Sequence, residues 1–112
     1  MRRFLFGAML LSAIAASCGW EEMADYPCPP GGTTLTYENF GQNFFQSYCI
    51  TCHGGPNGYS SRSFTDVGTI RAQAADIFRN AARDNTTMPP GPYDPPKDQR
   101  YQLGEWLACG AP

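Results

Sequence analysis

Apolar and aromatic residues recur at helical spacing in the middle of the chain, where they lead directly into a pair of cysteines. Thr36 precedes this stretch and is a suitable helix N-cap, and Gly54 and Gly55 are suitable to end it. The spacing predicts an amphipathic helix whose apolar face carries Tyr37, Phe40, Phe44, Phe45 and Tyr48.

Two further stretches have the same periodicity. A middle helix is predicted within residues 69–83, and a last helix from about Pro96 to Ala108, with Asp94 as a candidate cap. The two apolar faces carry Ile70, Ala74, Ile77, Phe78 and Ala81, and Leu103, Trp106 and Leu107. Because no alternating strand pattern and no internal repeat occurs, the sequence predicts an all-α fold with three main helices.

The N-terminus has the pattern of an export signal over residues 1–17. Arg2 and Arg3 are followed by an apolar stretch, which at residues 4–16 is too short for a bilayer span of about 20 residues. Ala15, Ala16 and Ser17 precede Cys18 as in a bacterial lipoprotein signal, which predicts a lipid on Cys18. The alternative is an ordinary signal peptide that leaves Cys18 as a stray thiol.

Prolines and glycines are concentrated in residues 18–34, for which we expect a lipidated tether without regular structure, followed by one domain over residues 35–112. The full chain of 112 residues has 8 basic and 10 acidic side chains. Removal of residues 1–17 takes away Arg2 and Arg3, which leaves 6 basic against 10 acidic side chains and a formal charge of −4. This acidic chain has no basic patch, so we expect no nucleic-acid partner.

Cys49, Cys52 and His53 form the pattern C-x-x-C-H, which is the attachment signature of c-type haem. Two thiols three residues apart on one turn can each add to a haem vinyl group. The imidazole that follows is then held next to the iron as an axial ligand. The pattern therefore predicts one covalently bound haem c.

The second iron ligand is predicted from the few residues that could supply it. His53 is the only histidine, so a bis-histidine haem cannot form within one subunit. Without residues 1–17 the chain has two methionines, of which Met23 lies in the predicted tether and Met88 in a rigid Met-Pro-Pro-Gly-Pro segment. We expect Met88 to be the sixth ligand, and Met/His ligation raises the reduction potential relative to more strongly donating pairs.

The remaining cysteines are Cys28 and Cys109. If Cys18 carries lipid and Cys49 and Cys52 carry haem, these two are the only pair left, and an oxidising compartment favours a disulfide between them. Two separate free thiols are the alternative.

These motifs resemble those of the small monohaem class I cytochromes c, over about Leu35 to Cys109. The family has a Gly, an aromatic residue and the first haem Cys at successive four-residue steps, as at Gly41, Phe45 and Cys49, and it has an apolar–aromatic pair in the last helix, as at Leu103 and Trp106. The resemblance implies a cytochrome c-like fold whose first and last helices cross at the small Gly. It also implies a backbone carbonyl, expected within residues 56–65, that orients His53. Tyr59 and Arg62 are candidates for contacts with the haem propionates.

The function expected from these features is electron transfer. We expect no enzymatic activity and no small-molecule substrate, redox proteins as partners, and a lipid anchor in the bacterial cell envelope, either facing the periplasm or in the outer membrane. One alternative is a haem-based sensor or a peroxidase-like protein in which the sixth ligand is labile. Another is a structural zinc bound by Cys49, Cys52, His53 and a further Cys, although adjacent Cys52 and His53 would reach one tetrahedral ion with difficulty.

Overall fold

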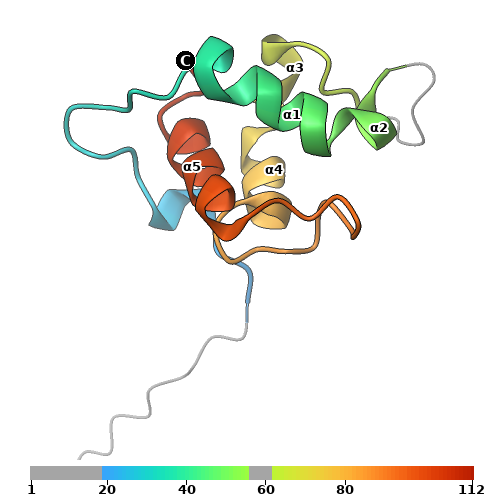
Figure 1. Ribbon diagram of the computed structural model, residues 1–112. Coiled ribbons are helices and arrows are strands. Elements are labelled where there is room, and N and C mark those ends of the chain that lie inside the picture. The colour runs from blue at the N-terminus through green and yellow to red at the C-terminus, as the bar shows by residue number, and fades with distance from the viewer. Residues whose placement is uncertain (1–18, 56–61) are drawn as a thin grey trace, which may run out of the picture.

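The computed structural model describes residues 19–55 and 62–112, and within these ranges it contains helices and no strand. The predicted all-α fold is therefore confirmed. Residues 1–17, Cys18 and Tyr59 lie outside the described residues. No helix in the described part of the chain is both long enough and apolar enough to cross a membrane. The elements are η1 (Met23–Asp25), η2 (Tyr37–Gly41), α1 (Gln42–Tyr48), α2 (Ile50–His53), α3 (Val67–Ala72), α4 (Ala74–Ala81) and α5 (Lys97–Ala108) (Figure 1).

The first helical stretch begins at the predicted N-cap. The Thr36 hydroxyl accepts a hydrogen bond from the Asn39 backbone N–H at 3.0 Å, and the Asn39 side chain accepts one from the Thr36 N–H at 2.7 Å. This reciprocal pair satisfies two backbone donors that the helix itself leaves unpaired. The stretch is not one regular helix, because its first turn is the π-helical η2 and Cys49 separates α1 from α2.

The middle stretch consists of two helices, although the sequence predicts one. Asp66 caps α3 by accepting a hydrogen bond from the Thr69 N–H at 2.9 Å. Gln73 then leaves the helical conformation, with φ −114° and ψ 14°, and its side chain donates to the Thr69 carbonyl at 3.2 Å. This local side-chain contact accompanies the break, which periodicity does not reveal. The predicted apolar face is confirmed, since Ile70, Ile77, Phe78 and Ala81 are buried.

The first helical stretch crosses α5 within the core, to which α3 and α4 also contribute buried residues. Gly41 and Trp106 meet at this crossing, and a Cβ atom added at Gly41 would lie only 2.7 Å from Cζ2 of Trp106. The Trp106 indole N–H donates to the Pro112 carbonyl at 3.1 Å, and the Tyr37 N–H donates to the same carbonyl at 2.6 Å. The C-terminus is thereby held against η2, and the implied close approach at Gly41 is confirmed.

Residues 19–34, which we call the strap, run along the outside of α5 (Figure 1). The prediction of no regular structure there is wrong, because Met23–Asp25 forms a 3₁₀ turn and Met23 packs against the core. The backbone of Glu21 forms two hydrogen bonds of 2.9 Å with the Asn85 side chain, and its carboxylate pairs with Arg83 at 3.2 Å. The strap is docked by specific polar contacts.

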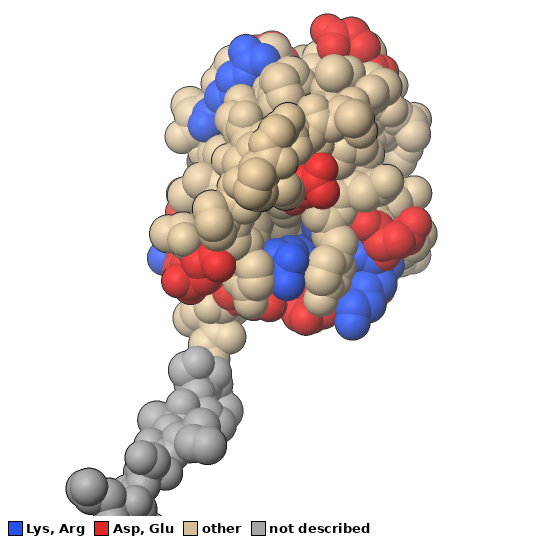
Figure 2. All heavy atoms as spheres, turned by 90° about the vertical axis from the view of Figure 1, so that its left-hand side faces the viewer, with Lys and Arg blue, Asp and Glu red and all other residues tan. Residues whose placement is uncertain are grey.

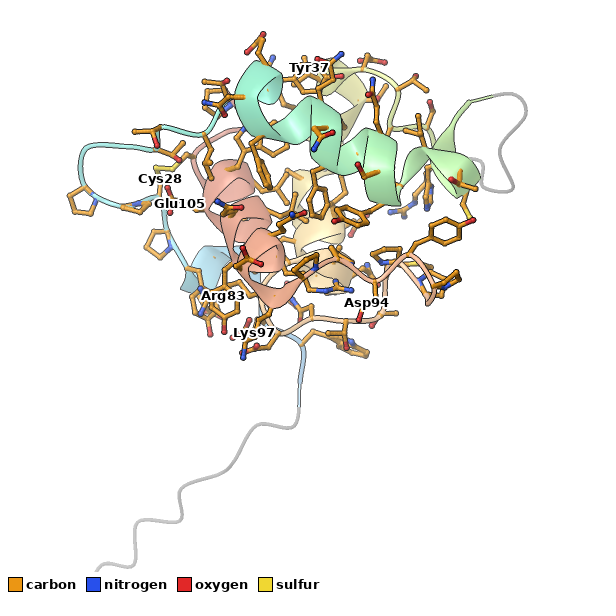
Figure 3. All side chains as sticks on the ribbon, viewed as in Figure 1. Cys28, Tyr37, Arg83, Asp94, Lys97 and Glu105 are labelled. Carbon is orange, nitrogen blue, oxygen red and sulfur yellow. A yellow bond between two sulfur atoms is a disulfide. The ribbon has the colours of Figure 1, made fainter. Side chains whose placement is uncertain are left out.

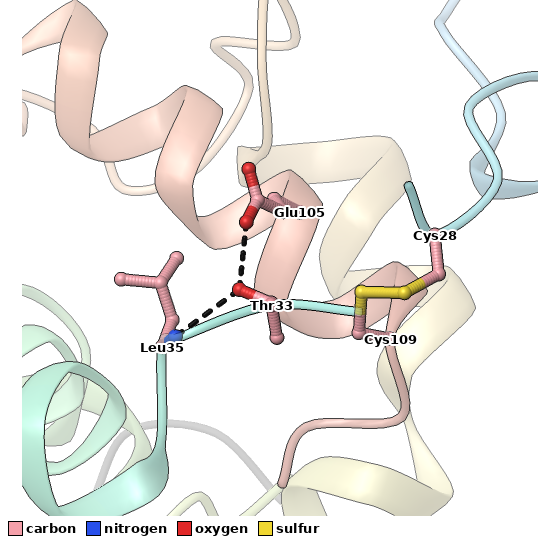
Figure 4. The surroundings of a disulfide bond; sticks show 5 residues. All are labelled: Cys28, Thr33, Leu35, Glu105 and Cys109. Atoms are coloured by element: carbon pink, nitrogen blue, oxygen red, sulfur yellow. Dashed lines mark hydrogen bonds between the residues drawn. A yellow bond between two sulfur atoms is a disulfide. The ribbon is translucent and has the colours of Figure 1, made fainter. Parts of the chain in front are cut away.

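A disulfide fixes the other end of the strap. Cys28 and Cys109 are bonded, with their Cα atoms 4.7 Å apart (Figure 4). Nearby, the Thr33 hydroxyl donates to the Glu105 carboxylate at 2.6 Å and accepts from the Leu35 N–H at 3.1 Å. The strap is therefore held at both of its ends before the chain enters η2.

Acidic and basic side chains are interspersed on the face that carries the strap (Figure 2). Ion pairs in this region join Arg79 to Glu22 at 2.9 Å and Lys97 to Asp84 at 3.3 Å. These exposed pairs contribute little stability individually. This face presents no field of a single sign.

We predict that Gly41→Ala destabilises the folded protein by about 1–3 kcal/mol, because the added methyl group overlaps the Trp106 ring at a tightly packed crossing. Chemical denaturation followed by far-UV circular dichroism would measure this. Gly19→Ala is the matched control, since a Cβ atom there meets nothing within 4 Å. Equal stability of the two variants would contradict the close crossing.

Candidate functional site

An apolar cavity of about 500 Å³ lies among α1, α2, α4 and the loop that follows Met88. Its volume is in the range of small-molecule and cofactor sites. Aromatic and aliphatic side chains form most of its walls, among them Phe44, Phe45, Tyr48, Phe64, Ile77 and Pro89. Figure 3 shows the aromatic side chains gathered between the helices and this loop.

Cys49, Cys52 and His53 all line this cavity. The interruption between α1 and α2 falls at Cys49, whose carbonyl accepts hydrogen bonds from the N–H groups of Cys52 at 3.2 Å and of His53 at 2.9 Å. This single turn brings both sulfurs and the imidazole to one wall. Neither thiol takes part in a disulfide.

Cys49 is a half-buried residue of this wall. Burial raises the pKa of the Cys49 thiol to about 12, against an opposing effect of the Arg100 guanidinium. In the free chain this sulfur is therefore a neutral group in an apolar wall. A neutral thiol in such a place is suited to lie against the edge of an apolar cofactor.

The His53 ring is oriented by its surroundings. Its Nδ1 lies 2.9 Å from the carbonyl oxygen of Arg62, and the ring stacks on Phe64 with centroids 4.5 Å apart. The Phe64 N–H also donates to the His53 carbonyl at 2.9 Å. When Nδ1 donates to Arg62, Nε2 keeps its lone pair for a metal. A carbonyl within residues 56–65 is thus confirmed, and it belongs to Arg62.

Met88 lines the same cavity from the segment between α4 and α5. Both of its backbone groups are fixed, because its N–H donates to the Asn80 carbonyl at 2.8 Å and its carbonyl accepts from Nη1 of Arg100 at 2.7 Å. Met88 as a whole residue remains 44% exposed. The sequence pattern predicts Met88 as an iron ligand but does not distinguish Arg100 from other arginines.

Two arginines stand at the margin of the cavity. Arg62, a candidate for the propionates, lines it and pairs with the Asp76 carboxylate at 3.0 Å. Arg79 also lines the cavity and pairs with Glu22, and nothing in the sequence pattern had distinguished it from other surface arginines. Tyr59 lies outside the described residues.

The residues around the cavity fit a haem c. The apolar walls suit the porphyrin, the two thiols suit its vinyl groups, and an imidazole and a thioether are ligands of iron. The zinc alternative gains no support, because residues 19–55 and 62–112 contain no group of three His, Cys, Asp or Glu side chains placed to hold a metal ion. Cys28 and Cys109 are in addition bonded to each other.

Residues 39–107 match the family model described as cytochrome c oxidase, cbb3-type, subunit III. The chain belongs to this family. It is a c-type cytochrome with covalently bound haem, it acts in haem-based electron transfer, and its partners are redox proteins. Comparison with curated proteins and with solved structures gives no match. The matched residues begin within η2, end within α5 and include all residues that line the cavity.

We predict that the double variant Cys49→Ser, Cys52→Ser loses covalent haem and most of its folded structure, because a domain of this size buries too little apolar surface to tolerate a cavity of about 500 Å³ in its core. Haem staining after denaturing electrophoresis and circular dichroism would measure the two effects. The double variant Cys28→Ser, Cys109→Ser is the matched control and should keep its haem. A folded, haem-free product of the first variant would contradict the assignment of the cavity.

Proposed function

We propose that this cytochrome carries one electron at a time on a single haem c attached to Cys49 and Cys52, with His53 and Met88 as the axial iron ligands. The observation that carries the proposal is that all four side chains line one cavity. The class I monohaem type, suggested by Gly41, Phe45, Leu103 and Trp106, is part of the same proposal. When bound, the haem supplies an iron that accepts and releases an electron.

The protein's contribution is to fix the two ligands. Arg62 holds the His53 ring through Nδ1, and hydrogen bonds to both backbone groups hold Met88. Ligands fixed in this way change little between the two oxidation states, which keeps the reorganisation energy small. Both axial positions are then filled, so we infer a carrier and not an enzyme.

One observation favours the alternative of a sensor or peroxidase-like protein. Met88 is 44% exposed, and a ligand close to solvent can exchange more easily. Against this, Met88 lies between a hydrogen bond to Asn80 and one from the buried Arg100. We favour the carrier because these hydrogen bonds hold the Met88 backbone beside the cavity. Dissociation of its sulfur from the iron would require either breaking them or rotating the side chain.

We also propose an envelope location, with residues 1–17 as a signal peptide, a lipid on Cys18, and the strap joining the anchor to the domain. The signal pattern supports export, and the Cys28–Cys109 disulfide is typical of an oxidising compartment. The described residues carry 6 basic and 10 acidic side chains, which favours redox partners with a positive patch. Gly19 in place of Asp after Cys18 is compatible with the outer membrane.

We predict that Met88→Ala removes the thioether–iron charge-transfer band of the oxidised protein, lowers the reduction potential, and strengthens cyanide binding by about tenfold or more, which is about 1.4 kcal/mol. Loss of the thioether opens the sixth position. Absorption spectroscopy, redox titration and cyanide titration would measure the three effects.

Met23→Ala is the control for this prediction. Met23 is a similar side chain that packs against the core from η1 and does not line the cavity. The control should keep the band and the potential. A Met88→Ala protein that kept both would place the sixth ligand elsewhere and would favour the sensor hypothesis.

We predict that Cys18→Ser, expressed with the complete signal, moves the cytochrome from the membrane fraction to the soluble fraction with an unchanged haem spectrum, because the variant cannot carry the lipid. Membrane fractionation with haem detection would measure this. Unchanged membrane association would exclude Cys18 as the anchor.

A further inference from the structure

Arg100 is a buried cation in the first turn of α5 and is only 2% exposed. Its Nη1 donates to the carbonyls of Ala81 at 2.8 Å, Asn85 at 3.1 Å and Met88 at 2.7 Å. Its Nη2 pairs with the Asp94 carboxylate. The prediction that Asp94 caps the last helix is wrong, because Asp94 instead pairs with this guanidinium. Burial of a charge costs free energy unless its hydrogen-bond donors have partners. These contacts therefore allow the Arg100 guanidinium to be buried.

The partners of Arg100 all belong to the segment that presents Met88. Ala81 is the last residue of α4, Asn85 lies midway to Met88, and Asp94 lies beyond it, on the loop before α5 (Figure 3). One planar guanidinium therefore joins the segment before Met88 to the loop after it. A single point charge such as a Lys ammonium reproduces such a fork poorly.

The backbone of Arg100 adds to this arrangement. Its carbonyl accepts a hydrogen bond from the Arg83 N–H at 2.9 Å, so α5 holds the same segment by main chain and side chain. On the opposite side, the Met88 N–H is bonded to Asn80 of α4. The position of Met88 is thus set by two helices, and Arg100 provides the contact from α5.

We propose that Arg100 is the positioning residue for Met88, and that it holds the loop in the conformation that presents the thioether to the cavity. The proposal rests on the proposed function of Met88 as an iron ligand. Arg100 acts through the Met88 backbone and does not itself touch the iron. Its removal should therefore weaken the thioether bond while the covalent haem remains.

The test uses the haem-loaded protein with Arg100→Gln and Arg100→Lys. We expect Arg100→Gln to reduce the thioether band and to strengthen cyanide binding by about tenfold, an effect in the range of coupling between contacting residues. We expect Arg100→Lys to fall between this variant and the unchanged protein, because it keeps the charge but loses the fork. Arg71→Gln is the matched control, since Arg71 also donates to a backbone carbonyl, that of Ala111 at 2.9 Å, and does not line the cavity.

A second pair of variants separates positioning from a general effect on the haem. In a Met88→Ala background, Arg100→Lys should leave the cyanide affinity unchanged, because the ligand that Arg100 positions is absent. An equal increase in both backgrounds would overturn the proposal. If Met88→Ala alone keeps the band, the proposed ligand is wrong. If Met88→Ala loses the thioether band while both Arg100 variants keep that band and the original cyanide affinity, Met88 is the ligand and only the role proposed for Arg100 is wrong.

If Arg100→Gln does not accumulate as folded holoprotein, Arg100→Lys and Asp94→Ala decide the outcome. Asp94→Ala frees one end of the guanidinium and leaves the three carbonyl contacts possible, so the fold should be kept. Both variants should weaken the thioether band. An unchanged band and an unchanged cyanide affinity in both would contradict the positioning role.

Discussion

The fold depends on an apolar cavity that the polypeptide does not fill by itself. A space of about 500 Å³ lies beside Phe44, Phe45 and Phe64, which are themselves buried and line its apolar wall. A chain of this size buries too little surface to leave such a space without loss of stability. The cofactor is therefore part of the core. The covalent attachment, the crossing at Gly41 and the fixing of the Met88 loop all serve to close the protein around it.

The parts of this arrangement that sequence could predict are those set by local spacing. Cys49, Cys52 and His53 occupy one turn, so their convergence on one wall follows from helix geometry. The crossing of Gly41 and Trp106 could be predicted because the resemblance supplied it. The carbonyl that orients His53 could be placed only within a segment, because backbone geometry rather than residue type decides which carbonyl faces the ring.

The contacts that sequence could not predict are formed between residues far apart in the chain. Arg100 falls in a polar stretch at the start of α5, where periodicity gives no reason to separate it from exposed arginines. Its burial follows from three carbonyls and the Asp94 carboxylate that come together only after folding. The docking of the strap was missed for a similar reason, because abundant Pro and Gly indicate irregular backbone but say nothing about its attachment.

The attachment of Glu21 has a consequence for how the cytochrome would meet its partners. Glu21 is bound to Asn85 and Arg83, so the free length of chain between the domain and a lipid at Cys18 is three residue steps, at most about 11 Å. A linker of this length would keep the domain close to the bilayer surface. If Cys18 carries the proposed lipid, the cytochrome would diffuse within a plane close to the bilayer, and a redox partner would have to approach it within the same thin layer.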